Sequence, residues 1–238
     1  MSATRAEFLA DAVTYHASLA EGWERRCQKR SFRMRQSVLQ KCLRDRTLAG
    51  TVWLDAGCGT GTLARWLAAR GCSVLGVDAA SEMVAAAAEA ARALDCSHRL
   101  SFVHVNTIAC LALDDNLLDG ILCSSVLEYV SDPTACLAEF ARVLKPGGLL
   151  LVSIPNRNSA VRRMQLACHR LGGRLGQKWA RFLDYSRHQY SKHEFEQLLM
   201  QAGFRGQKLV SFGSPLPRLA QRSRRWAPLL MFVAQKTA

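Results

Sequence analysis

The 238-residue sequence lacks an apolar run long enough to cross a membrane. Its longest apolar stretches, such as residues 148–154, fall far short of the about 20 residues that a transmembrane helix needs. The N-terminus also lacks the charged-then-apolar pattern of a signal peptide. The nine cysteines include no C-x-x-C pair, which argues against a zinc site and favours small, reduced apolar side chains. We therefore expect a soluble, cytoplasmic protein without a metal.

Acidic residues are scarce outside the middle of the chain. The net charge is +13, yet residues 50–150 hold six basic and eleven acidic side chains, so the positive excess lies in the flanks. Residues 25–46 carry nine basic side chains and one acid, and residues 157–181 carry seven and none. Contact with an anionic membrane or an anionic substrate explains these runs, and so do solvated helix faces.

Short apolar runs alternate with helical patterns from residue 51 onward. The expected strands span residues 51–55, 73–78, 100–105, 120–124, 149–154, 208–212 and 229–234. This order predicts a doubly wound α/β fold, with a mostly parallel seven-stranded Rossmann-like sheet, helices on both faces and a C-terminal antiparallel hairpin. Ser81 and Asp132 are the expected N-caps of helices that end near residues 94 and 144, and residues 191–194 form an expected capping box.

Four segments are expected within this fold. They are an N-terminal helical lid (1–48), a cofactor-binding core (49–156), a basic helical insertion or lid (157–190), and a C-terminal helix with edge strands that completes the same domain (191–238).

The insertion contains an amphipathic pattern over residues 160–171. The expected apolar face includes Val161, Met164 and Leu171, and Arg162 and Arg163 are expected on the opposite face. Such a helix could lie on anionic lipid or pack as a lid on the core.

A glycine-rich loop, residues 55–61, follows the first expected strand. Glycines let the backbone turn sharply and approach a ligand closely. A dinucleotide loop would need glycine where Thr62 stands, and the Gly-Lys-Ser/Thr of a phosphate loop is missing. Asp78 ends the second expected strand, where an acid can accept hydrogen bonds from ribose hydroxyls. Together they predict an adenosine-bearing cofactor without a pyrophosphate.

Four motifs in order resemble those of the class I (Rossmann-like) S-adenosylmethionine-dependent methyltransferases, most closely the small-molecule type that includes the ubiquinone-biosynthesis O-methyltransferases. They are residues 52–61, 77–83, 122–130 and 144–148. The resemblance implies an enzyme with S-adenosylmethionine as cofactor and S-adenosylhomocysteine as product. The implied cofactor-binding residues are Asp55, Gly57, Cys58, Gly59, Asp78, Ala79, Met83, Asn106, Thr107, Ser124, Tyr15 and Trp23.

The sequence departs from this family in two places. Asn106 stands where the family often has an acid, and its carbonyl can still accept a hydrogen bond. The ubiquinone-type enzymes carry a metal-holding Glu-x-x-Glu-His run, where this chain has Ser125, Glu128 and Tyr129. Two of the three ligands are missing, so a metal-assisted catechol reaction is not expected. The N-terminal aromatics, Tyr15 and Trp23, are equally compatible with core packing.

These features predict methyl transfer to a small-molecule acceptor, at oxygen, with an anionic or membrane-associated acceptor. His188 is the candidate base, although surface and capping roles are more common for histidine. The basic flanks suggest an alternative, an RNA or other nucleic-acid methyltransferase, but residues 124–127 do not have the Asn/Asp-Pro-Pro-Tyr/Phe signature of base methylases. A non-catalytic S-adenosylmethionine-binding assembly factor is a third hypothesis. The sequence does not indicate an oligomeric state.

Overall fold

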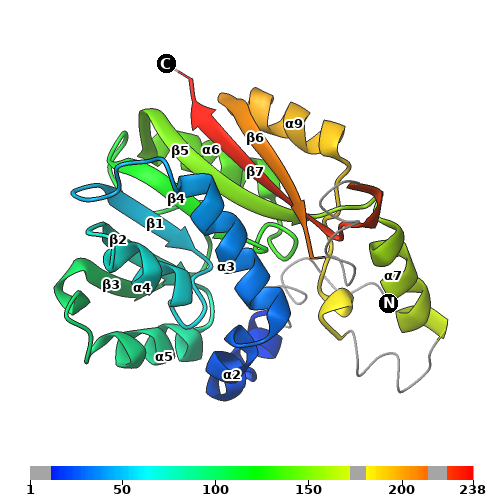
Figure 1. The fold of residues 1–238 in the computed structure, drawn as a ribbon, viewed down its shortest axis with the longest axis horizontal. Helices are drawn as coiled ribbons and strands as arrows, with labels where there is room; N and C mark the ends of the chain where they lie inside the picture. The colour runs from blue at the N-terminus through cyan, green and yellow to red at the C-terminus, as the bar shows by residue number, and fades with distance from the viewer. Residues whose placement is uncertain (1–11, 172–180, 214–223, 238) are drawn as a thin grey trace.

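One seven-stranded sheet runs through the middle of the molecule, between two layers of helices (Figure 1). The computed structural model describes residues 12–171, 181–213 and 224–237. The strands are β1 (Val52–Ala56), β2 (Ser73–Asp78), β3 (Leu100–His104), β4 (Leu118–Ser124), β5 (Leu144–Pro155), β6 (Phe204–Phe212) and β7 (Leu229–Lys236). The α-helices are α2 (Trp23–Cys27), α3 (Arg30–Leu43), α4 (Thr62–Ala68), α5 (Ser81–Ala91), α6 (Pro133–Val143), α7 (Ala160–Leu171) and α9 (Lys192–Gln201). The 3-10 helices are η1 (Ala20–Gly22), η2 (Ser97–Arg99), η3 (Arg181–Asp184) and η4 (Arg224–Trp226).

The strand order is β3-β2-β1-β4-β5-β7-β6. Neighbouring strands from β3 to β5 are parallel, and β7 is antiparallel to both β5 and β6. This confirms the doubly wound sheet with its C-terminal antiparallel hairpin. The chain moves outward from β1 to β3 and then returns to β4, so the order reverses between β1 and β4. Ligands of such sheets bind beyond the carboxyl ends of the strands at this point.

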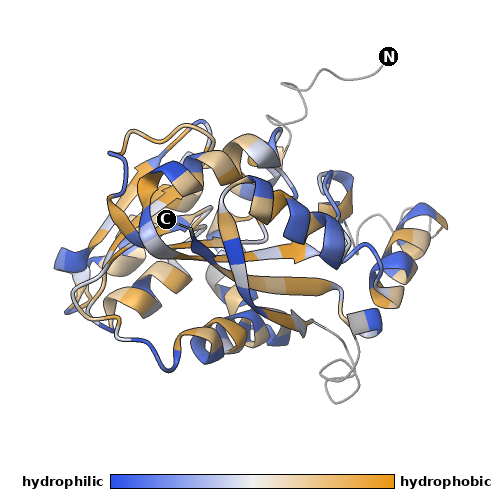
Figure 2. Ribbon diagram, turned by 90° about the horizontal axis from the view of Figure 1, so that it is seen from above, coloured by the Kyte–Doolittle hydropathy of each residue, from blue (hydrophilic) through white to orange (hydrophobic). Residues whose placement is uncertain are grey.

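Hydrophobic residues dominate the strands of the sheet (Figure 2), and buried apolar side chains pack on both of its faces. On one face, Leu39 of α3 and Leu67 of α4 pack with Trp53 of β1. On the other, Phe140 of α6 and Phe195 of α9 are fully buried. The strands are apolar on both sides because helices cover both sides, as expected for a largely parallel sheet.

Helix starts follow the sequence in two cases and depart from it in a third. Asp132 caps α6 by accepting a hydrogen bond from the backbone of Ala135, and residues 191–194 form the predicted capping box. The prediction for α5 is wrong, because Ala80 is the N-cap and Ser81 is already helical. The Asp78 carboxylate fixes this turn instead, by accepting the Ala80 N–H. The helix ends at residue 91, before the expected position near 94.

The position expected for Arg162 within residues 160–171 is also wrong. Val161 and Arg162 are buried in α7, whereas Met164 and Leu171 are 56% and 86% exposed. An arginine can face inward here because it meets a buried carboxylate, that of Glu128. The amphipathic pattern is real, but much of its apolar side faces outward. Among the described residues, no helix is both long and apolar enough to span a bilayer.

Candidate functional site

The glycine loop between β1 and α4 forms a cradle that side chains would fill. Gly57, Gly59 and Gly61 have φ angles of +72°, +54° and +74°, a region that favours glycine. A Cβ on Gly57 would lie 2.2 Å from Val126 Cγ2, and one on Gly59 would lie 3.2 Å from Trp23 Nε1. The loop therefore needs glycine for both its backbone and its neighbours.

Asp78 joins this loop to the end of β2. Its Oδ2 accepts the Gly59 N–H at 2.8 Å, and its Oδ1 accepts the Ala80 N–H at 2.9 Å. Each carboxylate oxygen can accept more than one hydrogen bond, so both can still receive a ribose hydroxyl. The glycine cradle and this oriented carboxylate fit the adenosyl cofactor that the sequence predicts.

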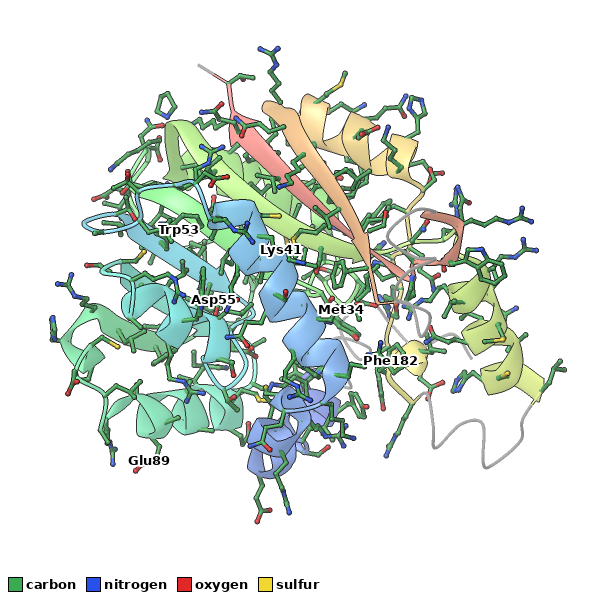
Figure 3. The ribbon with its side chains drawn as sticks, in the orientation of Figure 1. Met34, Lys41, Trp53, Asp55, Glu89 and Phe182 are labelled. Atoms are coloured by element: carbon green, nitrogen blue, oxygen red, sulfur yellow. The ribbon has the colours of Figure 1, made fainter. Side chains whose placement is uncertain are left out.

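Asp55 ties the same loop to helix α4. Its side chain lies at the end of β1 (Figure 3) and is 2% exposed, and its Oδ2 accepts the Ala64 N–H at 3.1 Å. Burial raises the pKa of Asp55 to about 7; the Ala64 hydrogen bond opposes this shift and the nearby Asp78 charge adds to it. Burial also raises the pKa of the Cys58 thiol, so Cys58 stays protonated and packs as an apolar side chain.

The other residues predicted to bind the cofactor surround this cradle. Ala79 follows Asp78, and Met83 is buried in α5 with 1% exposure. Asn106 and Thr107 are exposed just beyond β3, and Ser124 ends β4. The structure thus brings them to the carboxyl edge of neighbouring strands, and their ligand contacts stay predictions.

Aromatic side chains from the N-terminal segment cover the cradle. Trp23 lies against Gly59, and the His16 ring contacts both Trp23 and Tyr129, with centroids 6.0 and 4.9 Å apart. Tyr15 instead stacks on Tyr185, at 4.8 Å and 22°, and so lies toward the segment after α7. The predicted pair therefore separates: Trp23 lies over the glycine loop, whereas Tyr15 contacts His16 and Tyr185.

His16, a candidate proton acceptor, lies within this aromatic cover. Its Nε2 is buried and has no hydrogen-bond partner among the described residues. Burial lowers the pKa of His16 and outweighs the opposing charge of Asp78, so the imidazole is neutral at pH 7. A neutral imidazole beside a cofactor cradle can accept a proton from a substrate that reaches its Nε2.

Next to these aromatics lies a buried ion cluster, which we define as Glu128, Arg162, Ser186 and Arg35. Glu128 and Arg162 are 4% and 3% exposed, with 3.2 Å between Glu128 Oε2 and Arg162 Nη2. The Ser186 hydroxyl donates to Glu128 at 2.6 Å and accepts from Arg162 at 2.9 Å. Burial raises the pKa of Glu128 and outweighs the attraction of the two arginines.

The cluster holds more positive charge than negative. Arg35 of α3 interacts electrostatically with Glu128 and Tyr129, and its Nε is buried without a hydrogen-bond partner in the described structure. The Arg162 Nε is unpartnered in the same way. Two guanidinium groups thus face one carboxylate and keep buried donors available.

Sequence reasoning missed Arg35 and misplaced Arg162. The position of Arg35 carried a signal, because it precedes the buried Leu39 by four residues and thus lies on the inward face of α3. Nothing local indicates that Arg162 faces Glu128, because the two residues meet only through the fold.

His188 lies beside the ion cluster rather than over the cradle. Its Nε2 lies 3.0 Å from the Val130 carbonyl, to which it can only donate, and its backbone N–H donates to the Glu128 carbonyl. A proton-accepting role for His188 would therefore fall to Nδ1, and this role stays a prediction.

Comparison with known proteins agrees with this geometry. Residues 54–152 match a family model described as a methyltransferase domain. The ubiquinone biosynthesis O-methyltransferase of Psychrobacter arcticus is 31% identical over 168 residues, which are 68% of this chain and 62% of that protein. The corresponding protein of Xanthomonas oryzae is 39% identical over 114 residues, 48% and 46% of the two chains. The matches span about half to three-fifths of these relatives.

Solved structures extend the fold similarity to most of the chain. The magnesium protoporphyrin IX methyltransferase of Synechocystis, solved with bound S-adenosylhomocysteine, has a TM-score of 0.64 at 21% identity and covers 85% of this chain and 81% of its own. The putative methyltransferase crystallised with the Haloferax volcanii Trm112 activator has a TM-score of 0.71 at 22% identity, covering 94% and 98%. At these identities the similarity shows the fold alone.

Proposed function

The chain belongs to the class I S-adenosylmethionine-dependent methyltransferases, and we propose that it methylates a small-molecule acceptor at oxygen. The observation that carries the proposal is the glycine cradle held by Asp78 and covered by Trp23 and His16. It combines a carboxylate placed to accept ribose hydroxyls with an aromatic cover over the glycine loop.

The residues present suit the needs of this reaction. The cofactor supplies a methyl group on a positively charged sulfur, so the transfer moves charge away from that sulfur. Asp78 would orient the adenosine, and the aromatic cover would keep water out, which supports an in-line displacement. His16 would take the proton of an acceptor hydroxyl at its Nε2.

The buried ion cluster supports an anionic acceptor. Arg35 and Arg162 outnumber Glu128, and both keep an unpartnered Nε. Both arginines also interact electrostatically with Tyr129, which the His16 ring contacts. Buried charge is stable only when it is paired and hydrogen-bonded. An acceptor carboxylate would supply the missing negative charge and place its hydroxyl toward His16.

The proposal is tested by methyl transfer from labelled S-adenosylmethionine to hydroxy acids, such as 3-hydroxybenzoate, and to the matching amides. We expect an O-methyl product and a preference for the acid. A folded protein that binds neither S-adenosylmethionine nor S-adenosylhomocysteine contradicts the proposal. Cofactor binding without turnover of any acceptor favours the assembly-factor hypothesis, and methyl transfer to RNA favours the nucleic-acid one.

Replacing His16 with glutamine is expected to lower kcat by about 10²–10⁴-fold, the usual contribution of a positioned base. Because burial lowers the pKa of His16 below its ordinary value of 6.5, the wild-type rate should fall only as pH drops through that lowered value. The variant should lose this acid limb while its cofactor affinity stays within a few-fold. The matched variant His188→Gln separates the two candidate bases: a larger rate loss there assigns the role to His188.

Helix α7 supports a peripheral membrane contact. Such a contact would suit the membrane-associated acceptor that the sequence also suggests. α7 protrudes at one side of the molecule (Figure 1), with Met164, Cys168 and Leu171 exposed at helical spacing. Arg163 and Arg170 are also exposed on this helix. Apolar side chains flanked by arginines are the pattern of helices that lie on anionic lipid.

Replacing Met164 and Leu171 with serine is expected to weaken binding to phosphatidylglycerol vesicles by at least about tenfold, because each apolar side chain that enters lipid contributes about 1–3 kcal/mol. Cosedimentation with vesicles measures this. The control is Met200→Ser with Leu94→Ser, since these side chains are 68% and 36% exposed on other parts of the surface. Equal losses in both double variants, or no vesicle binding by the wild type, would contradict the membrane contact.

A further inference from the structure

A groove lies at the edge of the sheet opposite the glycine cradle. It has a volume of about 610 Å³ and lies between α3, the segment before β1, and the end of α4, and we call it the α3–α4 groove. Its position follows from α4, which begins at Thr62 beside the glycine loop and carries Trp66 near its far end. On the other side, Leu48 precedes β1 and forms part of the apolar lining. The groove is therefore separate from the proposed methyl-transfer site.

The lining of this groove is strongly positive. Lys41, Arg44, Arg46 and Arg70 contribute four cations, and no acidic residue is among its described lining residues. None of the four forms an ion pair with a described carboxylate. Lys41 lies on α3 (Figure 3). Four like charges around one groove repel one another, and a bound anion would relieve that repulsion.

Two of the arginines are already held in position. The Arg70 guanidinium lies 4.0 Å from the centroid of the Trp66 ring and donates to the Trp66 carbonyl at 3.1 Å. The Arg46 Nη2 donates to the Gln207 side chain at 2.7 Å, a neutral partner that leaves its charge uncompensated. Arginines fixed in this way lose less freedom when they bind an anion.

Trp66 lines the groove and carries an unsatisfied donor. Its Nε1 is buried and has no hydrogen-bond partner among the described residues. The indole nitrogen can only donate, and so can the guanidinium and ammonium groups around it. The complementary ligand carries several acceptor oxygens and negative charge, which is the chemistry of a phosphate group.

We propose that the α3–α4 groove binds a phosphate-bearing small molecule. Its volume falls within the range of small-molecule pockets, and its concave shape suits a phosphate ester or headgroup better than the backbone of an extended nucleic acid. A soluble nucleotide and an inositol phosphate headgroup share this chemistry. Neither requires methyl transfer, so the inference stands apart from the proposed function.

The test is calorimetry of the full chain with inorganic pyrophosphate and with AMP, and cosedimentation with phosphatidylcholine vesicles that contain phosphatidylinositol monophosphate. The double variant Lys41→Gln with Arg44→Gln is expected to bind pyrophosphate at least about tenfold more weakly. Trp66→Phe keeps a ring under Arg70 and removes the donor, so about a threefold to tenfold loss is expected. Thermal unfolding of each variant verifies that it remains folded.

The matched control is Arg30→Gln with Arg33→Gln, which removes the same charge from exposed positions at the other end of α3. It should change pyrophosphate affinity by less than about twofold at physiological salt. AMP binding, with vesicle binding that the Lys41→Gln/Arg44→Gln variant retains, assigns a soluble ester. Vesicle binding that this variant loses, without AMP binding, assigns a lipid headgroup. Equal losses in both double variants, no binding of any of these probes by the wild type, or binding of RNA without pyrophosphate would overturn the proposal.

Discussion

Replacing Glu128 with leucine is expected to lower the free energy of unfolding by about 3–5 kcal/mol. The substitution leaves Arg162, which is 3% exposed, without its carboxylate partner, and it removes the only acid that faces Arg35 in the cluster. It also removes the acceptor of the Ser186 hydroxyl. Urea unfolding measures the loss, and for a chain of this size the melting temperature should fall by roughly 6–20 °C.

The double variant Glu128→Leu with Arg162→Met tests the cause of this loss. Replacing both members of a buried ion pair with apolar groups is often neutral, so most of the stability should return. The exposed pair Lys192–Glu196 provides the control: Glu196→Gln should cost at most about 0.5 kcal/mol. If the double variant is no more stable than Glu128→Leu alone, the unpaired arginine is not the reason for the loss.

Glu128 also explains how the segment after α7 is positioned. Its side chain accepts the Ser186 hydroxyl, and its backbone carbonyl accepts N–H groups from Arg187 and His188. Glu128, in the segment that follows β4, therefore anchors three consecutive residues of the predicted lid. The family resemblance suggested a metal-ligand position here; the structure gives this carboxylate a guanidinium and a hydroxyl as partners.

The parallel strands and two of the three expected helix caps could be predicted from the sequence because their signals are local. Alternating apolar runs identify the parallel strands, and the Asp132 and Ser191 caps lie directly before their helices. The first residues of two strands were predicted less well. β5 begins at Leu144 and β6 at Phe204, whereas the sequence predicts starts at residues 149 and 208. In both strands a register shift lets the pairing continue past an irregularity that interrupts the apolar pattern.

The glycine cradle and the buried ion cluster differ in how far they could be predicted from the sequence. Asp55, the glycines and Asp78 belong to consecutive elements of one motif, so their spacing reveals them. Arg35, Glu128 and Arg162 come from three distant elements and meet only when α3 and α7 pack against the end of β4. A single sequence contains no periodic signal for such a meeting, and a buried arginine is the exception to the usual rule for charged residues.

Replacing Asp78 with alanine is expected to weaken S-adenosylmethionine and S-adenosylhomocysteine binding by about 10²–10⁴-fold. Two hydrogen bonds from ribose hydroxyls to a charged carboxylate contribute about 1.5–3 kcal/mol each. The same side chain accepts the Gly59 and Ala80 N–H groups, so its removal also releases the cradle from the end of β2. Both effects reduce affinity for the adenosyl group, and calorimetry with each ligand measures their sum.

Asp78→Asn separates these two contributions. Asparagine keeps the shape and one acceptor oxygen, so it can retain the Gly59 N–H contact but cannot accept from both sides as a carboxylate does. We expect an affinity between those of the wild type and the alanine variant. The control is Glu82→Gln, an acid in the first turn of α5 whose carboxylate accepts a hydrogen bond from the Ser81 hydroxyl.

The comparison with Glu82→Gln decides between a specific contact and general electrostatics. Both substitutions remove one negative charge near the carboxyl edge of β2, but only Asp78 touches the glycine loop. If the ribose contact carries the affinity, Glu82→Gln should stay within about twofold of the wild type. Similar losses in both variants would mean that a field effect on the positively charged cofactor dominates, and S-adenosylhomocysteine, which lacks that charge, would then bind both variants as the wild type does.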